Sequence, residues 1–510
     1  MTSVVLPGSD TNGDIEIDLN DVRIDPAWAL RIPASLAIRK RILPLSEKDG
    51  KVFVACLDPN DQATSSAVSR YIEESLELVR ASSHSMDRVL LRIYGGASMP
   101  GAASGRPLRM RESDARTTGD SDSEGAIALC DELMQSAVLR SASDIHIDPT
   151  KNEVLVQFRV DGQLEEYREL PSESHNGLIS RFKVMAEMDI AEKRAPQDGR
   201  FTYNVGPTAQ QVDVRVASLP TKHGERMTLR LLTMQSHSLT LEDLGMGTDD
   251  LSTFETAISR PHGLILLTGP TGSGKSTTLF AALSRLLQRR KVNVITIEDP
   301  VEYEIPGAAQ VEVDSVDKVS FHKALRSVLR HDPDVVMLGE IRDGETADIA
   351  MKAALTGHLV FSTLHTNSAS GVVTRLLDMD LQRFLVSATM RLAVAQRLVR
   401  QLCNRCSSER ALSESEALAI QRPELNGVIV REPVGCLYCA NRGFTGRIGL
   451  FELLPFDETL SHLVAEGAGE AEIAEFMQQT QRHALIDDAV EKLVHGQTTY
   501  AEVISAVTVW

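Results

Sequence analysis

The pattern of apolar and polar positions along this chain differs between three regions, and each region is predicted to form a different module. Between 26 and 94 the pattern is mixed, with a strand-like run at 52–55 and helical spacing at 65–78, which indicates a small α/β module. From 126 onward, an amphipathic helical stretch precedes segments in which apolar and polar residues alternate, which is typical of strands. The helical segments are 127–139 and 177–188, and the strands are 145–147, 154–160, 163–167, 211–218 and 225–232. This second module is therefore predicted to be α+β.

In the third pattern, from about 241 to 402, short apolar runs alternate with helical segments. The predicted strands are 264–268, 292–297, 335–338 and 359–363. Such alternation is typical of a parallel sheet of the nucleotide-binding type. Outside the modules, 1–21 is predicted to be a flexible acidic tail, and 96–125, rich in Gly, Ser, Ala and Asp, a linker. The segment 404–510 contains a cysteine cluster followed by predicted short helices.

The composition excludes several classes of protein. At 510 residues, with 42% hydrophobic and 24% charged residues, the chain is long enough for several globular domains. A net charge of −18 and an aromatic content of 4% argue against a broad nucleic-acid surface. The polar, acidic start does not resemble a secretory signal, and no apolar run approaches the roughly 20 residues of a membrane span. We expect a cytosolic chain without disulfides, whose membrane role comes through a partner.

The most informative motif follows the predicted strand 264–268. It has the form G-x-x-x-x-G-K-S and precedes a helical segment at 278–287, which is the strand–loop–helix context of a phosphate-binding loop. The glycines let backbone N–H groups surround a phosphate, and the helix start adds its positive dipole end. Lys275 can reach the β- and γ-phosphates, and Ser276 can ligate Mg²⁺. The residues predicted to bind a nucleoside triphosphate are Gly269, Pro270, Thr271, Gly272, Ser273, Gly274, Lys275, Ser276 and Thr277.

Acidic residues and a histidine follow the other predicted strands. Glu340 ends the run at 335–338, where ATPases place a carboxylate that orients water or holds Mg²⁺, although Gly339 stands where many such motifs carry Asp. Glu298 opens a cluster of three carboxylates, which would repel one another without a cation or an arginine among them. A histidine at the position of His365 can sense a γ-phosphate by hydrogen bonding, but by spacing alone a structural role is favoured.

Four of the six cysteines form a C-x₂-C … C-x₂-C set at Cys403, Cys406, Cys436 and Cys439. Two short chelating pairs at this separation suit a tetrahedral Zn²⁺ ion with four thiolate ligands. Four protein ligands leave no open position, so the predicted site is structural. Iron–sulfur ligation lacks its usual spacing here, and unliganded thiols or redox pairs remain as alternatives.

Together these motifs resemble the Walker A, Asp-box, Walker B and His-box segments of the secretion ATPases of type II secretion and type IV pilus systems. The resemblance covers about 126 to the C-terminus, and the type II secretion assembly ATPases are the most similar in layout. Its further segments are Ala142-Ser143-Asp144-Ile145-His146-Ile147, Lys183-Val184-Met185-Ala186, Pro196-Gln197-Asp198-Gly199-Arg200, Leu219-Pro220-Thr221 and Gly446-Arg447-Ile448-Gly449.

The resemblance implies a fold and a domain order. The fold is α/β, with a RecA-like P-loop NTPase domain preceded by an α+β, PAS-like domain and a small N-terminal α/β domain. A zinc-binding and helical region completes the chain. The implied domains are an N-terminal partner-docking domain (1–95), a flexible linker (96–125), an arginine-bearing α+β domain (126–233), the ATPase domain (240–402), a tetracysteine zinc-binding insertion (403–445) and a C-terminal helical region (446–510).

The resemblance also assigns roles to the candidate residues. Lys275 would hold phosphates, Ser276 would hold Mg²⁺ and Glu340 would activate water. The implied catalytic residues are Glu340, Glu298, His365, Arg200 and Arg215. The two arginines would reach the γ-phosphate from the preceding domain, because a guanidinium neutralises charge spread over its oxygens. Without the resemblance, each arginine would be interpreted as a surface ion pair.

The implied activity is ATP hydrolysis that powers pseudopilus assembly and protein export by a type II secretion system. The implied protein is a cytoplasmic homo-hexamer with ATP, Mg²⁺ and Zn²⁺, recruited peripherally to the inner membrane. Its implied partners are the cytoplasmic domain of a secretion platform protein and, indirectly, pseudopilin subunits; neither nucleic acid nor direct membrane insertion is expected. The alternatives are a type IV pilus assembly ATPase, a nucleotide-gated scaffold and a DNA-translocating ATPase.

Overall fold

The structure is a computed structural model that describes residues 16–94, 121–205, 210–233, 239–313, 320–480 and 482–507. The chain divides into two compact units. The first comprises Met1–Met234, Cys403–Ser408 and Pro433–Thr445, and the second comprises Gln235–Leu402, Glu409–Glu432 and Gly446–Trp510. Most of the predicted linker lies outside the described residues, as do the first 15 residues of the predicted tail.

The N-terminal module of the first unit is a three-stranded sheet, β1-β2-β3, with four helices. Strands β1 and β2 are antiparallel, while β2 and β3 are parallel. Its elements are α1 (Pro26–Ala29), α2 (Ala34–Lys40), β1 (Leu43–Lys48), β2 (Lys51–Cys56), α3 (Gln62–Val68), β3 (Ser75–Arg80) and α4 (Ser83–Tyr94).

Two sequence predictions for this module are wrong. The spacing at 65–78 predicts one helix, but α3 ends at Val68 and β3 begins at Ser75, because the alternation around Leu76 and Leu78 is that of a strand. The polar start of the chain predicts a flexible tail as far as residue 21. Ile17 and Leu19 are instead buried in the module's hydrophobic core, and Ile17 forms a bridge with Ala81. Apolar residues at 15, 17 and 19 alternate with acidic ones, which is a strand-like signal that the acidic composition of the segment outweighed in the prediction.

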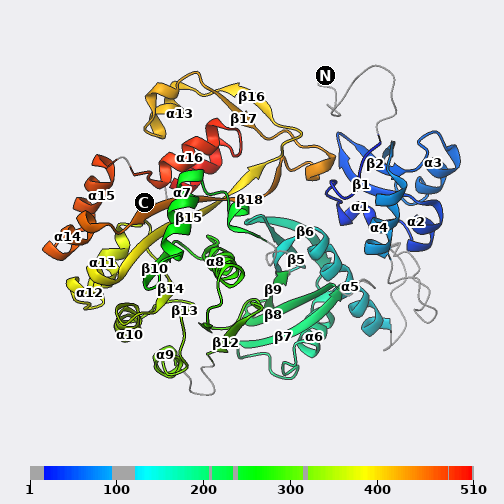
Figure 1. Cartoon of the computed structure of the whole chain (residues 1–510). Coiled ribbons are helices and arrows are strands. Elements are labelled where there is room, and N and C mark those ends of the chain that lie inside the picture. The colour runs from blue at the N-terminus through cyan, green and yellow to red at the C-terminus, as the bar shows by residue number, and fades with distance from the viewer. Residues whose placement is uncertain are drawn as a thin grey trace. The chain divides into compact units, whose positions relative to one another are not determined.

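The α+β module of the first unit is a six-stranded sheet in the order β6-β5-β4-β9-β8-β7, with α5 and α6 packed together (Figure 1). All its paired strands are antiparallel. Along β5 every second residue is buried, as a sheet with one covered face requires. Helix α5 begins six residues before the predicted start. The elements are α5 (Ser121–Leu139), β4 (Ala142–Pro149), β5 (Glu153–Val160), β6 (Gln163–Pro171), α6 (Ser174–Met185), β7 (Gln197–Val205), β8 (Gln210–Thr221) and β9 (Gly224–Thr233).

The second unit is built on a seven-stranded sheet in the order β12-β11-β13-β14-β10-β15-β18. Its central strands are buried along their whole length because both faces are covered. Leu264 and Leu266 of β10 enter one hydrophobic cluster, while Ile265 and Leu267 enter another. Up to β15 its elements are η3 (Leu241–Leu244), α7 (Thr248–Ile258), β10 (Gly263–Thr268), α8 (Lys275–Arg289), β11 (Val294–Glu298), β12 (Ala308–Glu312), α9 (Phe321–Val328), β13 (Val335–Leu338), α10 (Gly344–Leu355), β14 (Leu359–Leu364), α11 (Gly371–Asp378), α12 (Arg383–Thr389) and β15 (Met390–Leu402).

The segment after β15 differs from the helical region predicted at 446–510. Strand β18 lies beside β15 at the sheet edge, and its Leu450, Phe451 and Leu454 are fully buried. The remaining elements are β16 (Ser408–Ala411), α13 (Glu414–Ala419), η4 (Pro423–Leu425), β17 (Ile429–Glu432), η5 (Leu437–Cys439), β18 (Phe444–Pro455), α14 (Glu458–Glu466), α15 (Glu470–Gln479), α16 (Leu485–Val494) and α17 (Tyr500–Val507). Among the described residues, no helix has the length and apolar character to cross a bilayer.

Candidate nucleotide site and tetracysteine site

The phosphate-binding loop connects β10 to α8 and depends on glycine at both ends. Gly269 has a φ of 146° and Gly274 a φ of 91°, values that disfavour any residue with a Cβ. A Cβ on Gly269 would lie 2.4 Å from the Gln396 carbonyl oxygen, and one on Gly274 would lie 2.8 Å from the Gln396 side-chain nitrogen. The neighbouring strand β15 therefore presses against the loop and fixes its path.

Polar groups in this loop are available to an anion. Helix α8 begins at Lys275, and its N-cap, Gly274, provides no side-chain hydrogen bond to the first turn. The buried Ser273 hydroxyl has no hydrogen-bond partner among the described residues. Ser276 is exposed and Thr277 half-buried at the start of the helix. Free N–H groups at a helix start, together with its dipole, suit a phosphate group.

Lys275 is held inside this loop. Its ammonium donates hydrogen bonds to the carbonyl oxygens of Gly269, at 2.7 Å, and Pro270, at 3.0 Å. The side chain is buried, and the residue is only 8% exposed. Burial, with a smaller contribution from the nearby Arg397 guanidinium, lowers the pKa of Lys275 to about 8, and Glu340 opposes this shift. A phosphate would replace the two carbonyls with a stronger, charged partner.

Glu340 and His365 lie together at the carboxyl ends of neighbouring parallel strands. The His365 Nε2 atom is 3.2 Å from a Glu340 carboxylate oxygen. Arg342 forms an ion pair with Glu340 and lies 3.5 Å from an Asp299 carboxylate oxygen. The arginine that the acidic cluster requires is thus Arg342, a residue that belongs to none of the predicted sites.

Glu298 is buried at the end of β11 and is only 4% exposed. Its carboxylate accepts hydrogen bonds from the Thr296 hydroxyl at 2.6 Å and the Gln310 amide at 2.9 Å. These two hydrogen bonds satisfy the buried carboxylate of Glu298 and hold it in one position.

Short hydrogen bonds tie these strand ends to one another. The Thr268 hydroxyl, which precedes the phosphate loop, accepts the Thr366 N–H at 2.6 Å. The Thr363 hydroxyl donates to the Gly339 carbonyl oxygen at 2.7 Å. The order β13-β14-β10 places these strands side by side, so the phosphate loop, Glu340 and His365 share the edge where open α/β sheets bind ligands.

Two further residues of the site, both on β15, were not predicted from the sequence. Gln396 accepts a hydrogen bond from the Thr278 hydroxyl at 2.9 Å, and Arg397 donates to the Asn367 carbonyl oxygen at 3.2 Å. Gln396 and Arg397 are both buried. They link the first turn of α8 and the loop after His365. The signal that would have identified them is a polar pair that interrupts the otherwise apolar run 392–399.

Arg200 and Arg215 belong to the first unit and are register partners on β7 and β8. Arg215 is also opposite Arg230 on β9, so three arginines form a row across the sheet. Their strand positions alternate with the buried Val214 and Val216, which places the row on the face opposite the core. Arg230 is paired with an acid, because its guanidinium lies 3.1 Å from the carboxylate of Asp144, its register partner on β4.

The four cysteines are brought together as the spacing predicted. Their sulfurs lie within 4.8 Å of one another, and none is in a disulfide. Sulfur–sulfur distances are 3.8 Å for Cys403–Cys436, 3.7 Å for Cys406–Cys439 and 3.8 Å for Cys436–Cys439. Zn–S bonds of about 2.3 Å in a tetrahedron separate the sulfurs by about 3.8 Å. The donor set and its size therefore fit zinc.

Hydrogen bonds to sulfur support thiolate character at this site. The pKa of the Cys439 thiol is lowered to about 5, chiefly because it accepts a hydrogen bond from the Cys436 thiol. The backbone N–H groups of Cys436, at 3.2 Å, and Gly443, at 3.1 Å, also donate to this sulfur. Burial raises the pKa of Cys406 to about 11. A bound divalent cation would stabilise the thiolate form of all four cysteines, including Cys406.

Residues 120–505 match the type II/IV secretion system protein family, and residues 13–99 match the MshEN domain. The chain belongs to the type II/IV secretion system protein family. It is 41% identical over 485 residues to type II secretion system protein E of Pectobacterium carotovorum subsp. carotovorum, covering 93% of this chain and 96% of the relative.

Other members are also similar. The type IV pilus assembly ATPase PilB of Myxococcus xanthus is 36% identical, with 96% of this chain and 88% of the relative covered. The crystal structure of the pilus retraction motor PilT with bound ADP matches with a TM-score of 0.51 and 26% identity, over 74% of this chain and 96% of that chain. Family membership, the phosphate loop and these neighbours together establish the RecA-like ATPase fold and ATP hydrolysis as the family activity.

Proposed function

We propose that this family member is the assembly ATPase of a type II secretion system. In this proposal it hydrolyses ATP to power assembly of the pseudopilus and protein export across the outer membrane. The observation that carries the proposal is the 41% identity to a type II secretion system protein E, maintained over 93% of this chain and 96% of the relative.

The proposed chemistry starts at the phosphate loop. ATP phosphates would displace the carbonyl oxygens of Gly269 and Pro270 from Lys275, whose ammonium then holds the β- and γ-phosphates. The buried Ser273 hydroxyl would gain a partner. The Ser276 hydroxyl would ligate Mg²⁺, which neutralises phosphate charge when bound.

Glu340 is proposed to orient and activate the attacking water. Its position at the end of β13 is fixed from both sides, by Arg342 and by His365. His365 would then contact the phosphate region, so that the water-activating carboxylate and the phosphate are linked through one imidazole. Glu298, buried one strand away from β13, would assist near the metal or the water.

Arg200 and Arg215 are proposed to supply positive charge to the γ-phosphate from the α+β module. Their directly opposite positions on β7 and β8 support this role, because two neighbouring guanidinium groups suit the charge spread over phosphate oxygens. Closure of the arginine-bearing module on ATP, and reopening after hydrolysis, would convert the chemistry into motion.

The tetracysteine site is proposed to bind one structural Zn²⁺ ion per chain. Four converging sulfurs with tetrahedral spacing support this assignment. Zinc would tie the segment after β15 to the segment before β18, two strands that lie beside each other in the central sheet.

The proposed working form is a cytoplasmic homo-hexamer that is recruited peripherally to the inner membrane. Its N-terminal module would bind the cytoplasmic domain of a platform protein, and pseudopilin subunits would be moved indirectly. Support comes from the family membership and from the similarity to ATPases named as pilus and secretion motors.

Type IV pilus assembly is a second candidate function, favoured by the 36% identity to PilB. Complementation of two deletion strains, one lacking the type II ATPase and one lacking the pilus ATPase, separates these functions. Rescue of export alone supports the proposal, while rescue of piliation alone supports pilus assembly.

A nucleotide-gated scaffold and a DNA translocase would each behave differently from a secretion motor. A scaffold would bind ATP without turnover, and a translocase would show DNA-stimulated hydrolysis with a steep salt dependence. The test is phosphate release by purified oligomer with and without duplex DNA. The proposal predicts Mg²⁺-dependent release that DNA does not change, and a strictly DNA-dependent rate would overturn it.

A further inference from the structure

The residues enclosed by the two cysteine pairs contact the N-terminal module. Leu437 and Tyr438 are the two residues between Cys436 and Cys439. Leu437 is only 4% exposed and belongs to the hydrophobic core cluster of the N-terminal module, and Tyr438 packs against that cluster. Arg405, between the other two cysteines, lies over the Tyr438 ring at 4.2 Å from its centroid.

Hydrogen bonds and an ion pair reinforce this contact. The Arg23 N–H donates to the Tyr438 carbonyl oxygen at 3.2 Å. The Lys48 ammonium donates to the Gly435 carbonyl oxygen at 2.8 Å. The Asn441 amide donates to the Glu47 carbonyl oxygen, and Arg405 forms an ion pair with Asp21 at 3.4 Å. Each bond joins the cysteine segments to the N-terminal module within the first unit.

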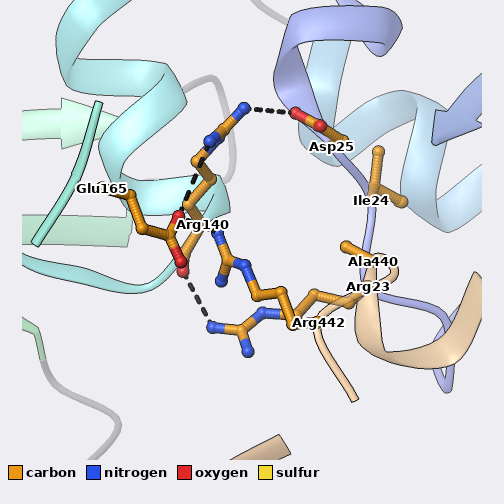
Figure 2. A pocket seen from close by; sticks show the side chains of 7 residues that line it. All are labelled: Arg23, Ile24, Asp25, Arg140, Glu165, Ala440 and Arg442. Carbon is orange, nitrogen blue, oxygen red and sulfur yellow. Dashed lines mark hydrogen bonds and ion pairs between the residues drawn. The ribbon is translucent and has the colours of Figure 1, made fainter. Parts of the chain in front are cut away.

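A charged cavity of about 270 Å³ lies beside this contact and is lined by the N-terminal module, the α+β module and the second cysteine segment, through Ala440 and Arg442 (Figure 2). Arg140 forms an ion pair with Asp25 at 2.6 Å, and Arg442 forms one with Glu165 at 2.8 Å. Arg23 also donates to the Arg140 carbonyl oxygen at 2.9 Å. The arginine side chains are mostly buried. These ion pairs favour one arrangement of the contact, because a shifted arrangement would leave buried charges unpaired.

Metal binding would constrain the residues that make the contact. In each C-x₂-C pair, chelation closes a small ring around the two intervening residues and fixes their backbone. Here one ring contains Leu437 and Tyr438, and the other contains Arg405. Without a metal, the sulfurs are held only by weak S–H hydrogen bonds and by the backbone N–H groups of Cys436 and Gly443, which both donate to Cys439.

We propose that the tetracysteine site is the docking surface for the chain's own N-terminal module and that bound metal keeps the module docked. The site then does more than stabilise the ATPase: it sets the position of the partner-docking module. This inference rests on the zinc site proposed above, and its test measures metal content separately.

The test is hydrogen exchange resolved to single amides on the full chain, with zinc content measured by atomic absorption. The Arg23 amide reports docking, because its acceptor is Tyr438. The Asp25 amide is the internal control, because its acceptor, Leu45, lies within the module. Removal of metal with a chelator is expected to accelerate exchange at Arg23 by at least about tenfold and to leave Asp25 unchanged.

A pair of leucine variants separates docking from metal binding. Leu437→Ala retains all four cysteines, and it is expected to accelerate Arg23 exchange while zinc content stays at about one per chain. Leu418→Ala makes the same chemical change at a residue that is 57% exposed, and no effect is expected. Both variants are compared under conditions in which the Asp25 amide exchanges at the same rate.

Three results would overturn the inference. The first is an Arg23 amide that stays protected after zinc is shown to be lost. The second is Leu437→Ala with unchanged Arg23 exchange. The third is Arg23 protection that falls on dilution, which would mean that a second copy's module occupies the surface. Absence of zinc from the purified protein would instead contradict the metal site itself.

Discussion

Lys275 provides a prediction whose size follows from the structure. In the empty protein its pKa is about 8, because the side chain is buried and Arg397 lies nearby. Bound to ATP phosphates, the ammonium gains a strong counter-charge, so its pKa rises far above that value. The empty protein therefore binds fewer protons than the complex. ATP binding takes up protons, and affinity falls as the pH rises.

The expected proton uptake follows from the fraction of neutral Lys275. It is about 0.1 proton at pH 7, about 0.5 at pH 8 and about 0.9 at pH 9. The same fractions predict that Kd increases about twofold from pH 7 to 8 and about fivefold from pH 8 to 9. Isothermal titration with the Mg²⁺ complex of β,γ-imido-ATP, in buffers of different ionisation enthalpy, measures both quantities.

A matched control isolates Lys275 from other titrating groups. Lys275→Arg keeps a positive charge that does not titrate in this range, so its pH-dependent uptake between 8 and 9 should vanish even where binding is weaker. Proton uptake near zero when the wild-type protein binds nucleotide at pH 9 would refute the reasoning. So would identical uptake in the wild-type and Lys275→Arg proteins.

The remaining predictions concern turnover, loop geometry and metal. Glu340→Gln should bind ATP with unchanged Kd but lower kcat by roughly 10³-fold in a phosphate-release assay, the scale expected when a water-activating group is lost. A kcat within tenfold of the wild-type value would exclude this role. Gly269→Ala should destabilise the fold by about 1–3 kcal/mol in urea titrations, because φ is 146° and the new Cβ meets a backbone oxygen at 2.4 Å. Gly272→Ala, with nothing within 4 Å of its Cβ, should destabilise it less, and equal losses of stability would contradict the argument. Arg215→Gln should lower kcat more than it raises KM, and the reverse pattern would indicate a binding role only. Cys436→Ser should lose zinc and lower Tm, and unchanged metal content would exclude this cysteine as a ligand.

The sequence predicted four strands of the nucleotide sheet, β10, β11, β13 and β14, because they are short, mostly apolar and followed by chemically distinctive loops, whereas β12, β15 and β18 were not predicted. Strand β13 has the predicted bounds, and β10 and β14 differ from prediction by one residue at one end. The cysteine pairs were equally informative, since C-x₂-C spacing restricts each pair to one local geometry. In both cases a local pattern determines a local structure.

Features that depend on distant segments were not predicted. Ile17 and Leu19 are held by residues more than 60 positions away: Ile17 forms a bridge with Ala81, and the Leu19 N–H donates to the Ser85 hydroxyl. Strand β18 is defined by its neighbour β15, more than 40 residues earlier in the chain. Gln396 acquires its role only because parallel pairing brings β15 beside the phosphate loop.

Steady-state phosphate release by the purified protein tests the central claim most directly. The account predicts Mg²⁺-dependent release by the wild-type protein and a rate at least about a thousandfold lower for Lys275→Ala, since the loop would lose its one ammonium. Undiminished release by folded Lys275→Ala protein would contradict it.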